Sequence, residues 1–141
     1  MTKLTINKYA AKKISQGIAV LDARDFPGNS YTEGFADLYF EHQFVSKAYF
    51  SRQNKGIGWT VTSTDFSQLL TDAKNKRKTY AQDSSTTAYR IFNQDGDGFG
   101  GMTIDIYGDY ALFSWYNAFI YTLKDEILSA FQTVFPEILG A

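Results

Sequence analysis

The spacing of apolar residues changes at Thr64. Before Thr64, short apolar runs with a period of about two residues are separated by Gly, Pro and Asn, a pattern typical of strands. Directly after it, over residues 66–80, apolar residues recur three and four positions apart, which is typical of one face of a helix. The change predicts an α+β protein in two parts, residues 1–63 and residues 64–141.

The first part has the pattern of a small β structure with one short helix. Gly17 ends the helix, because glycine commonly follows the last helical turn. We expect strands at residues 4–6, 18–21, 35–41, 44–50 and 57–62, and the helix at residues 9–14. Several short strands with one helix predict a small barrel.

The second part predicts a helix, three strands and a final helix. Thr64 or Asp65 caps the first helix, residues 66–80, and its basic end at Lys74–Lys78 compensates the helix dipole. RNA binding is the alternative use of these cations. Strands at residues 88–92, 102–106 and 110–116 form a meander, and a helix over residues 120–135 ends at Pro136.

Composition removes several kinds of chemistry. The chain has no cysteine and a single histidine, His42, so disulfides, thiolate metal sites and cysteine nucleophiles are excluded and no metal site is expected. No apolar run approaches the ~20 residues of a membrane-spanning helix, and the N-terminus lacks the apolar core of a signal peptide. We therefore expect a cytoplasmic protein that binds no membrane.

Charge and aromatic residues point to the first part as the binding surface. Residues 1–63 carry a net charge of +3 and residues 64–141 a net charge of −4. Side chains of the first part that could combine phosphate contact with base stacking are Lys12, Lys13, Lys47, Tyr49, Arg52 and Lys55. Tyr49 is open to either role, base stacking or core packing.

The glycine-rich segment 96–101 allows three interpretations. It fits the dinucleotide pattern G-x-G-x-x-G, but a strand pattern follows it where that site needs a helix N-terminus. Asn93, Asp95 and Asp97 imitate the start of a calcium loop, but Ile104 stands where the closing Glu is required. The favoured interpretation is structural, with glycines at positive φ and Asp side chains capping backbone N–H groups.

A longer segment around this loop resembles a known family. Residues 89–109, YRIFNQDGDGFGGMTIDIYGD, are similar to a signature of class I S-adenosylmethionine-dependent methyltransferases of large-subunit ribosomal RNA, of the 5-methylcytosine type. The matching positions are Tyr89, Arg90, Asp97, Gly98, Gly101, Asp105, Tyr107, Gly108 and Asp109. Gly100 and Ile106 depart from the Pro and Arg that the family usually has there.

The resemblance implies a fold, a cofactor and partners. Residues 1–63 resemble an RNA-binding PUA domain, a pseudo-β-barrel, and residues 64–141 the N-terminal part of a helix–hairpin–helix linking domain. The Rossmann-like domain that binds S-adenosylmethionine and holds the catalytic cysteine lies outside these residues. We therefore expect an N-terminal fragment with no catalytic residue and no cofactor in this chain, whose partners are ribosomal RNA and the parent enzyme's catalytic domain.

Two other functions stay open, a structural or protein-docking module without RNA affinity and a small stand-alone enzyme. Within the signature segment we expect a structural role for Asp97, Gly98, Gly101 and Asp105, and a structural or domain-docking role for Arg90. Arg90 lies in an otherwise apolar strand beside two carboxylates, so we expect a charge-assisted hydrogen bond to Asp97 or Asp105.

Overall fold

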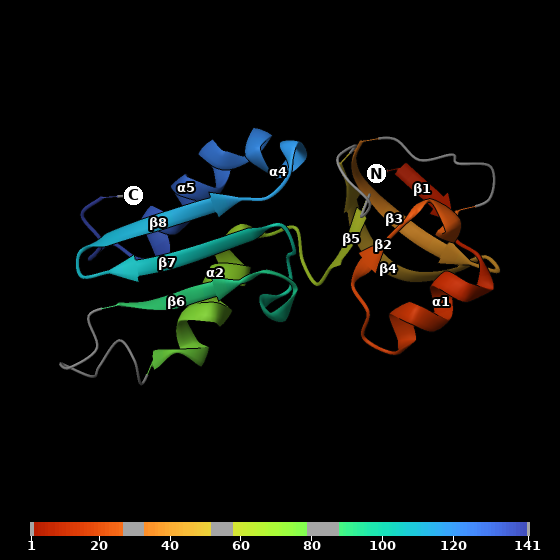
Figure 1. The fold of residues 1–141 in the computed structure, drawn as a ribbon, viewed down its shortest axis with the longest axis horizontal. Coiled ribbons are helices and arrows are strands. Elements are labelled where there is room, and N and C mark those ends of the chain that lie inside the picture. Colours follow the sequence, from red (N-terminus) through yellow and green to blue (C-terminus); the bar gives the residue numbers. More distant parts are fainter. Residues whose placement is uncertain (1, 27–32, 52–57, 79–87, 141) are drawn as a thin grey trace.

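The chain folds into two sheets that lie side by side (Figure 1). The computed structural model describes residues 2–26, 33–51, 58–78 and 88–140. The first sheet contains β1 (Thr2–Thr5), β2 (Val20–Leu21), β3 (Gly34–Phe40), β4 (Gln43–Phe50) and β5 (Gly58–Val61). The second contains β6 (Ala88–Asn93), β7 (Met102–Tyr107) and β8 (Tyr110–Trp115). None of the described helices is long and apolar enough to cross a membrane.

One face of the first sheet is covered by α1 (Lys8–Ser15). The Asn7 side chain caps this helix by accepting a hydrogen bond from the Ala10 N–H, 2.9 Å away. Ala10 is buried in one core cluster with Ala36 and Ala48 of the strands. Phe50 is fully buried in the same core, so the expected strands and helix of this half are present.

The first sheet is open, with strand order β1-β3-β4-β5-β2. Its edges are β1, which pairs in parallel with β3, and β2, a two-residue strand that pairs with β5. Among the described residues β1 does not pair with β2, so the sheet does not close into a barrel there. The mixed α and β content is confirmed, but the expected barrel is not.

The second sheet is the expected antiparallel meander, in the order β6-β7-β8. The helices α2 (Phe66–Lys76) and α5 (Lys124–Val134) cover one of its faces, where Leu70 and Phe131 pack against Ile104 (Figure 1). Asp65 is the N-cap of α2 and accepts from the Gln68 N–H. The last helical region is divided at Leu123 into α5 and a short helix α4 (Ala118–Thr122), where we predicted one continuous helix.

The two sheets meet through a stack of aromatic rings. Tyr49 of β4 lies between Trp59 of β5 and Phe99 of the glycine-rich segment 96–101, which we call the glycine loop. The ring centroids of Trp59 and Phe99 lie 5.1 Å and 4.9 Å from that of Tyr49. Its hydroxyl donates to the Gly100 carbonyl and accepts from the Asn117 side-chain amide, 2.9 Å away. Tyr49 is fully buried, so both polar bonds of its hydroxyl are made inside the protein.

The glycine loop reaches this stack because it lacks side chains at the points of contact. Gly98 and Gly101 have φ angles of +94° and +91°, in the left-handed region that glycine adopts most easily. A Cβ at Gly101 would overlap the Tyr49 hydroxyl and the Asn117 amide, and one at Gly98 would overlap the Thr62 hydroxyl. The conformation agrees with the structural interpretation of the glycines.

Gly101→Ala should therefore destabilise the protein far more than Gly108→Ala. Both glycines have positive φ, but no atom of the described residues, outside the glycine and its two chain neighbours, lies within 4 Å of the position of a Cβ on Gly108. We expect a loss of about 1 kcal/mol for Gly108→Ala from backbone strain, and about 3 kcal/mol for Gly101→Ala from strain and overpacking together. Urea unfolding of both variants measures the difference, and equal losses would contradict the role of close approach.

Candidate functional site

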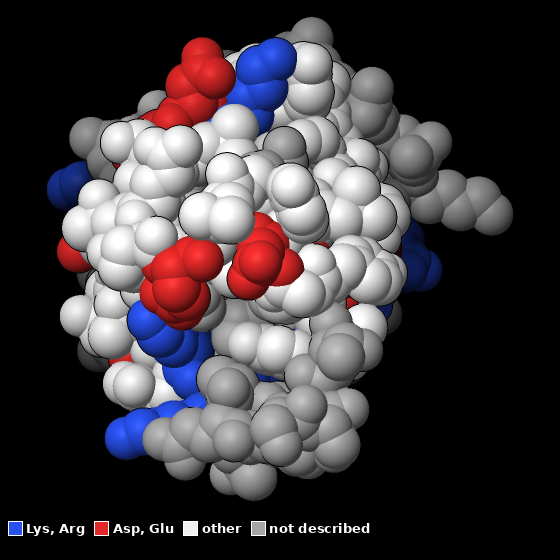
Figure 2. Space-filling view, turned by 90° about the vertical axis from the view of Figure 1, so that its left-hand side faces the viewer, with Lys and Arg blue, Asp and Glu red and all other residues white. Residues whose placement is uncertain are grey.

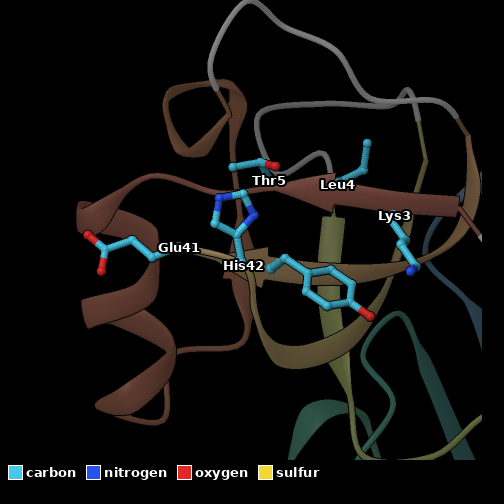
Figure 3. A pocket seen from close by; sticks show the side chains of 6 residues that line it. Lys3, Leu4, Thr5, Glu41 and His42 are labelled. Carbon is cyan, nitrogen blue, oxygen red and sulfur yellow. The ribbon is translucent and has the colours of Figure 1, made fainter.

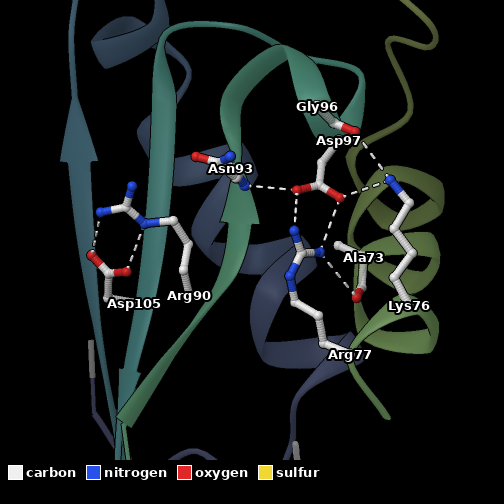
Figure 4. A network of polar contacts seen from close by, with 8 residues as sticks. All are labelled: Ala73, Lys76, Arg77, Arg90, Asn93, Gly96, Asp97 and Asp105. Carbon is white, nitrogen blue, oxygen red and sulfur yellow. Dashed lines mark hydrogen bonds and ion pairs between the residues drawn. The ribbon is translucent and has the colours of Figure 1, made fainter. Parts of the chain in front are cut away.

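The glycine loop is fastened to α2 by the carboxylate of Asp97 (Figure 4). The short 3-10 helix η3 (Gln94–Asp97) presents this carboxylate, whose exposed fraction is 1%. Arg77 donates two hydrogen bonds to it, at 3.0 Å and 2.7 Å, and Lys76 donates a third at 3.0 Å. The backbone N–H of Asn93 donates a fourth at 2.7 Å. The arrangement joins the start of the loop to the end of α2.

Four donors around one carboxylate determine its charge state. Burial alone would raise the pKa of Asp97, but the hydrogen bonds from Arg77, the Asn93 N–H and Lys76 outweigh burial and lower it. The basic end of α2 is therefore neither a simple solvated helix end nor a free RNA site. Two of its cations, on Lys76 and Arg77, hold Asp97.

Arg90 makes the expected charge-assisted bond, and its partner is Asp105. The two residues are cross-strand neighbours on β6 and β7, and the guanidinium donates at 2.8 Å and 3.3 Å to the two carboxylate oxygens. The Arg90 side chain is 47% exposed, so this pair lies on a solvent-exposed surface of the second sheet. Solvent screening makes such a pair a weak contributor to stability.

The four predicted RNA-binding residues that the structure describes do not form one surface. Lys12 is exposed on α1, whereas Lys13 is bonded at 2.9 Å to the buried carboxylate of Asp25. Lys47 lies on β4 beside Ala48, so alternation along the strand points it to the face opposite α1. Tyr49 is a correction, because its ring is buried in the stack between the sheets and cannot stack on a base. Arg52 and Lys55 lie outside the described residues.

A basic and aromatic surface does exist on the face of the first sheet opposite α1. Its members are Lys3 of β1, Tyr39 of β3, and Phe44 and Lys47 of β4; we call these four residues the open face. The Lys3 ammonium lies 5.5 Å from the centre of the Tyr39 ring, and the Tyr39 and Phe44 rings meet edge to face at 5.9 Å. Phe44 is 54% exposed.

Next to the open face lies one carboxylate, that of Asp37, which has fewer close contacts than its charge requires. Lys3, Asp37 and Lys47 lie in one row across β1, β3 and β4, and the Lys47 ammonium is 3.8 Å from Oδ1 of Asp37. That oxygen is buried and has no hydrogen-bond partner among the residues that the structure describes, so the pair is an ion pair at long distance without a hydrogen bond. One carboxylate against two ammonium groups leaves a net positive row.

The opposite end of the molecule has a different surface. Figure 2 shows mostly uncharged side chains there, with acidic groups among them and basic groups beside those. Tyr107, Tyr110, Leu112 and Leu139 are exposed on β7, β8 and the residues that follow α5. The end shown is therefore not a uniformly basic surface for nucleic acid.

Comparison with known proteins identifies the relatives. The chain is 38% identical over 143 residues to a Bacillus subtilis protein named "Putative ribosomal RNA large subunit methyltransferase YwbD", a match over 92% of this chain and 36% of that protein. It is 32% identical over 72 residues to the Escherichia coli ribosomal RNA large subunit methyltransferase I, 51% of this chain and 18% of that protein. The homologues are ribosomal RNA methyltransferases. No family model matches the chain.

Solved structures agree with these homologues. A protein described as "a putative SAM-dependent methyltransferase from Streptococcus mutans" superposes with a TM-score of 0.91 and 47% identity over 100% of this chain and 40% of its own. A "putative methyltransferase complexed with SAH" superposes equally well, over 39% of its own chain. This chain therefore spans about two fifths of these methyltransferases and 36% of the Bacillus relative.

The comparison corrects the expectation that this chain has no cofactor. It aligns along 100% of its length with a structure that holds SAH, which makes S-adenosylmethionine a candidate ligand of the chain. The glycine loop does not fit that ligand as a cradle. The positions that Cβ atoms would take at Gly98, Gly100 and Gly101 are already in contact with Thr62, Trp59 and Tyr49.

Replacing Asp97 should reveal its ion pairs through the pH dependence of stability. Its folded pKa is lowered, so its contribution is complete above the unfolded pKa of about 4 and is lost as the pH falls through the folded pKa. At pH 7 we expect Asp97→Asn to lose about 2 to 4 kcal/mol. The deficit relative to wild type should shrink on acidification to about pH 2.

Denaturant unfolding at both pH values measures this deficit.

The arginine partners give a matched pair of variants, Arg77→Ala and its control Arg90→Ala, because each removes one guanidinium from a bidentate carboxylate pair. Arg90 is the more exposed, so Arg90→Ala should lower the melting temperature slightly and Arg77→Ala strongly. A pH-independent deficit for Asp97→Asn would argue against the ion pairs.

Proposed function

We propose that this chain is an RNA-binding unit of a ribosomal RNA methyltransferase and that RNA lies across the open face. The observation that carries the proposal is the group formed by the exposed Phe44 ring, the partly exposed Tyr39 ring and the ammonium groups of Lys3 and Lys47. Ammonium groups contact phosphates, and exposed rings stack on unpaired bases. Lys12 is exposed on α1, which covers the other face of the sheet, so we propose it as a phosphate contact only for RNA that extends around the sheet edge.

The finer assignments rest on sequence similarity to the family signature. We propose that residues 1–63 correspond to its PUA-like RNA-binding domain and residues 64–141 to its linking domain. The proposed methyl acceptor is C5 of a cytosine. The Asp97 and Tyr49 contacts support the proposal indirectly, because they give the open face a fixed position relative to the second sheet.

A docking module without RNA affinity is the second candidate. It is favoured by the exposed apolar side chains of Tyr107, Tyr110, Leu112 and Leu139 at the far end of the second sheet. Apolar side chains that are exposed together on a soluble protein commonly mark a protein interface. The two candidates use different ends of the molecule, so binding experiments separate them.

Lys3→Gln combined with Lys47→Gln should weaken RNA binding across sequences. Each lysine lost removes one phosphate contact and the counterion that this contact releases, so the slope of log affinity against log salt should become about 2 units less steep. Fluorescence anisotropy of a labelled ribosomal RNA stem-loop at two or more salt concentrations measures both effects.

The control is Lys78→Gln combined with Lys124→Gln. It changes the net charge equally but lies on the half of the chain that holds the second sheet. We expect this control to bind nearly as wild type does. Equal weakening by both double variants would reject the open face as the site, and absence of wild-type binding at low salt would favour the docking module.

A further inference from the structure

The turn between β3 and β4 has an uncommon sequence for its conformation. Phe40 pairs with Gln43, so the loop has two residues, and Glu41 and His42 have φ angles of +49° and +68°. Positive φ at both positions defines a type I′ turn, which strongly favours Asn-Gly because other side chains are strained there. The chain therefore tolerates strain at two adjacent residues where a relaxed turn sequence is available.

Backbone strain of this kind clusters at ligand-binding and active sites. The turn borders a pocket of about 360 Å³, which is within the size range of small-ligand sites. Its lining residues are Lys3, Leu4, Thr5, Tyr39, Glu41 and His42. Figure 3 shows the His42 imidazole beside Thr5, with Lys3 across the pocket from it, whereas the Glu41 side chain points away from the imidazole.

The lining has the chemistry of a nucleotide site. The Tyr39 ring is held edge to face by Phe44 and approached by the Lys3 ammonium, so an aromatic ring and a phosphate-binding cation adjoin each other. The His42 imidazole adds a second flat ring that can both stack and form hydrogen bonds. Flat rings recognise a base only when it is unpaired, because a paired base hides its faces within the duplex.

We propose that this pocket holds one unpaired nucleotide, with its base against His42 and Tyr39 and its phosphate near Lys3. The proposal rests on the RNA-binding function proposed above and assigns it a specific contact, a single-stranded segment rather than a duplex. His42 is then the residue for which the strained turn is retained.

Two glycine substitutions in the turn test the proposal, His42→Gly and, as its control, Glu41→Gly. His42→Gly and Glu41→Gly each relieve strain at a positive φ, so neither should lower the melting temperature. Only His42→Gly removes a ring from the pocket. We expect its affinity for a labelled single-stranded oligoadenylate to fall about tenfold, as loss of one stacking contact predicts, and that of Glu41→Gly to stay equal or rise.

The single histidine of the chain supplies a direct signal. In NMR spectra of the wild-type protein, the His42 imidazole C–H resonances should shift when oligoadenylate is added. The same resonances should shift much less when inorganic phosphate or an RNA duplex is added. Equal affinity of His42→Gly and wild type for the single strand would overturn the pocket while leaving the RNA-binding function intact. A shift produced equally by phosphate or by duplex would overturn the unpaired nucleotide. Absence of wild-type binding to any RNA would overturn both proposals.

Discussion

The rings of Trp59, Tyr49 and Phe99 stack in series, and this stack joins the two sheets. Its central ring is fully buried, and its hydroxyl bonds to Gly100 and Asn117. Burial raises the pKa of the Tyr49 hydroxyl, which keeps it protonated and able to donate. The glycine loop must therefore lie directly on Tyr49, and the loop sequence is adapted to that approach.

The constraint extends from the stack to α2. The loop enters through Gly98, whose carbonyl accepts from the Thr62 N–H on the first half, and leaves through Gly101, whose carbonyl accepts from Tyr116 after β8. Asp97 fixes the start of the loop to Arg77. Ring stacking, backbone pairing and a buried ion pair thus act on the same few residues, and together they give the open face a defined position.

Much of the fold was predictable because the spacing of apolar residues along the chain indicates which residues are buried. The strands, α1, the start of α2 at Asp65 and the meander follow from the spacing of apolar residues and from capping chemistry. The break at Leu123 was missed, since apolar residues on both sides of it fit one helical face. The open sheet was also missed, because strand patterns carry no information on which strands become edges.

The site was less predictable, since it depends on contacts between distant segments. Alternation placed Tyr49 on the same face as Lys47, but that face is exposed near Lys47 and covered by Phe99 near Tyr49. The Asp97 pairs join residues 20 and 21 positions apart. Lys3, Tyr39 and His42 meet only through strand pairing, and Glu41-His42 lacks the turn residues that would have indicated a type I′ turn.

Native-state hydrogen exchange tests most directly whether the stack joins the two sheets into one cooperative unit. The Thr62 and Tyr116 amides donate to the two ends of the glycine loop, to Gly98 and Gly101 respectively. If the account is correct, both amides exchange only by global unfolding, with the same free energy as the core amide of Ile104. Exchange of Thr62 and Tyr116 through a local opening, well before Ile104, would contradict it.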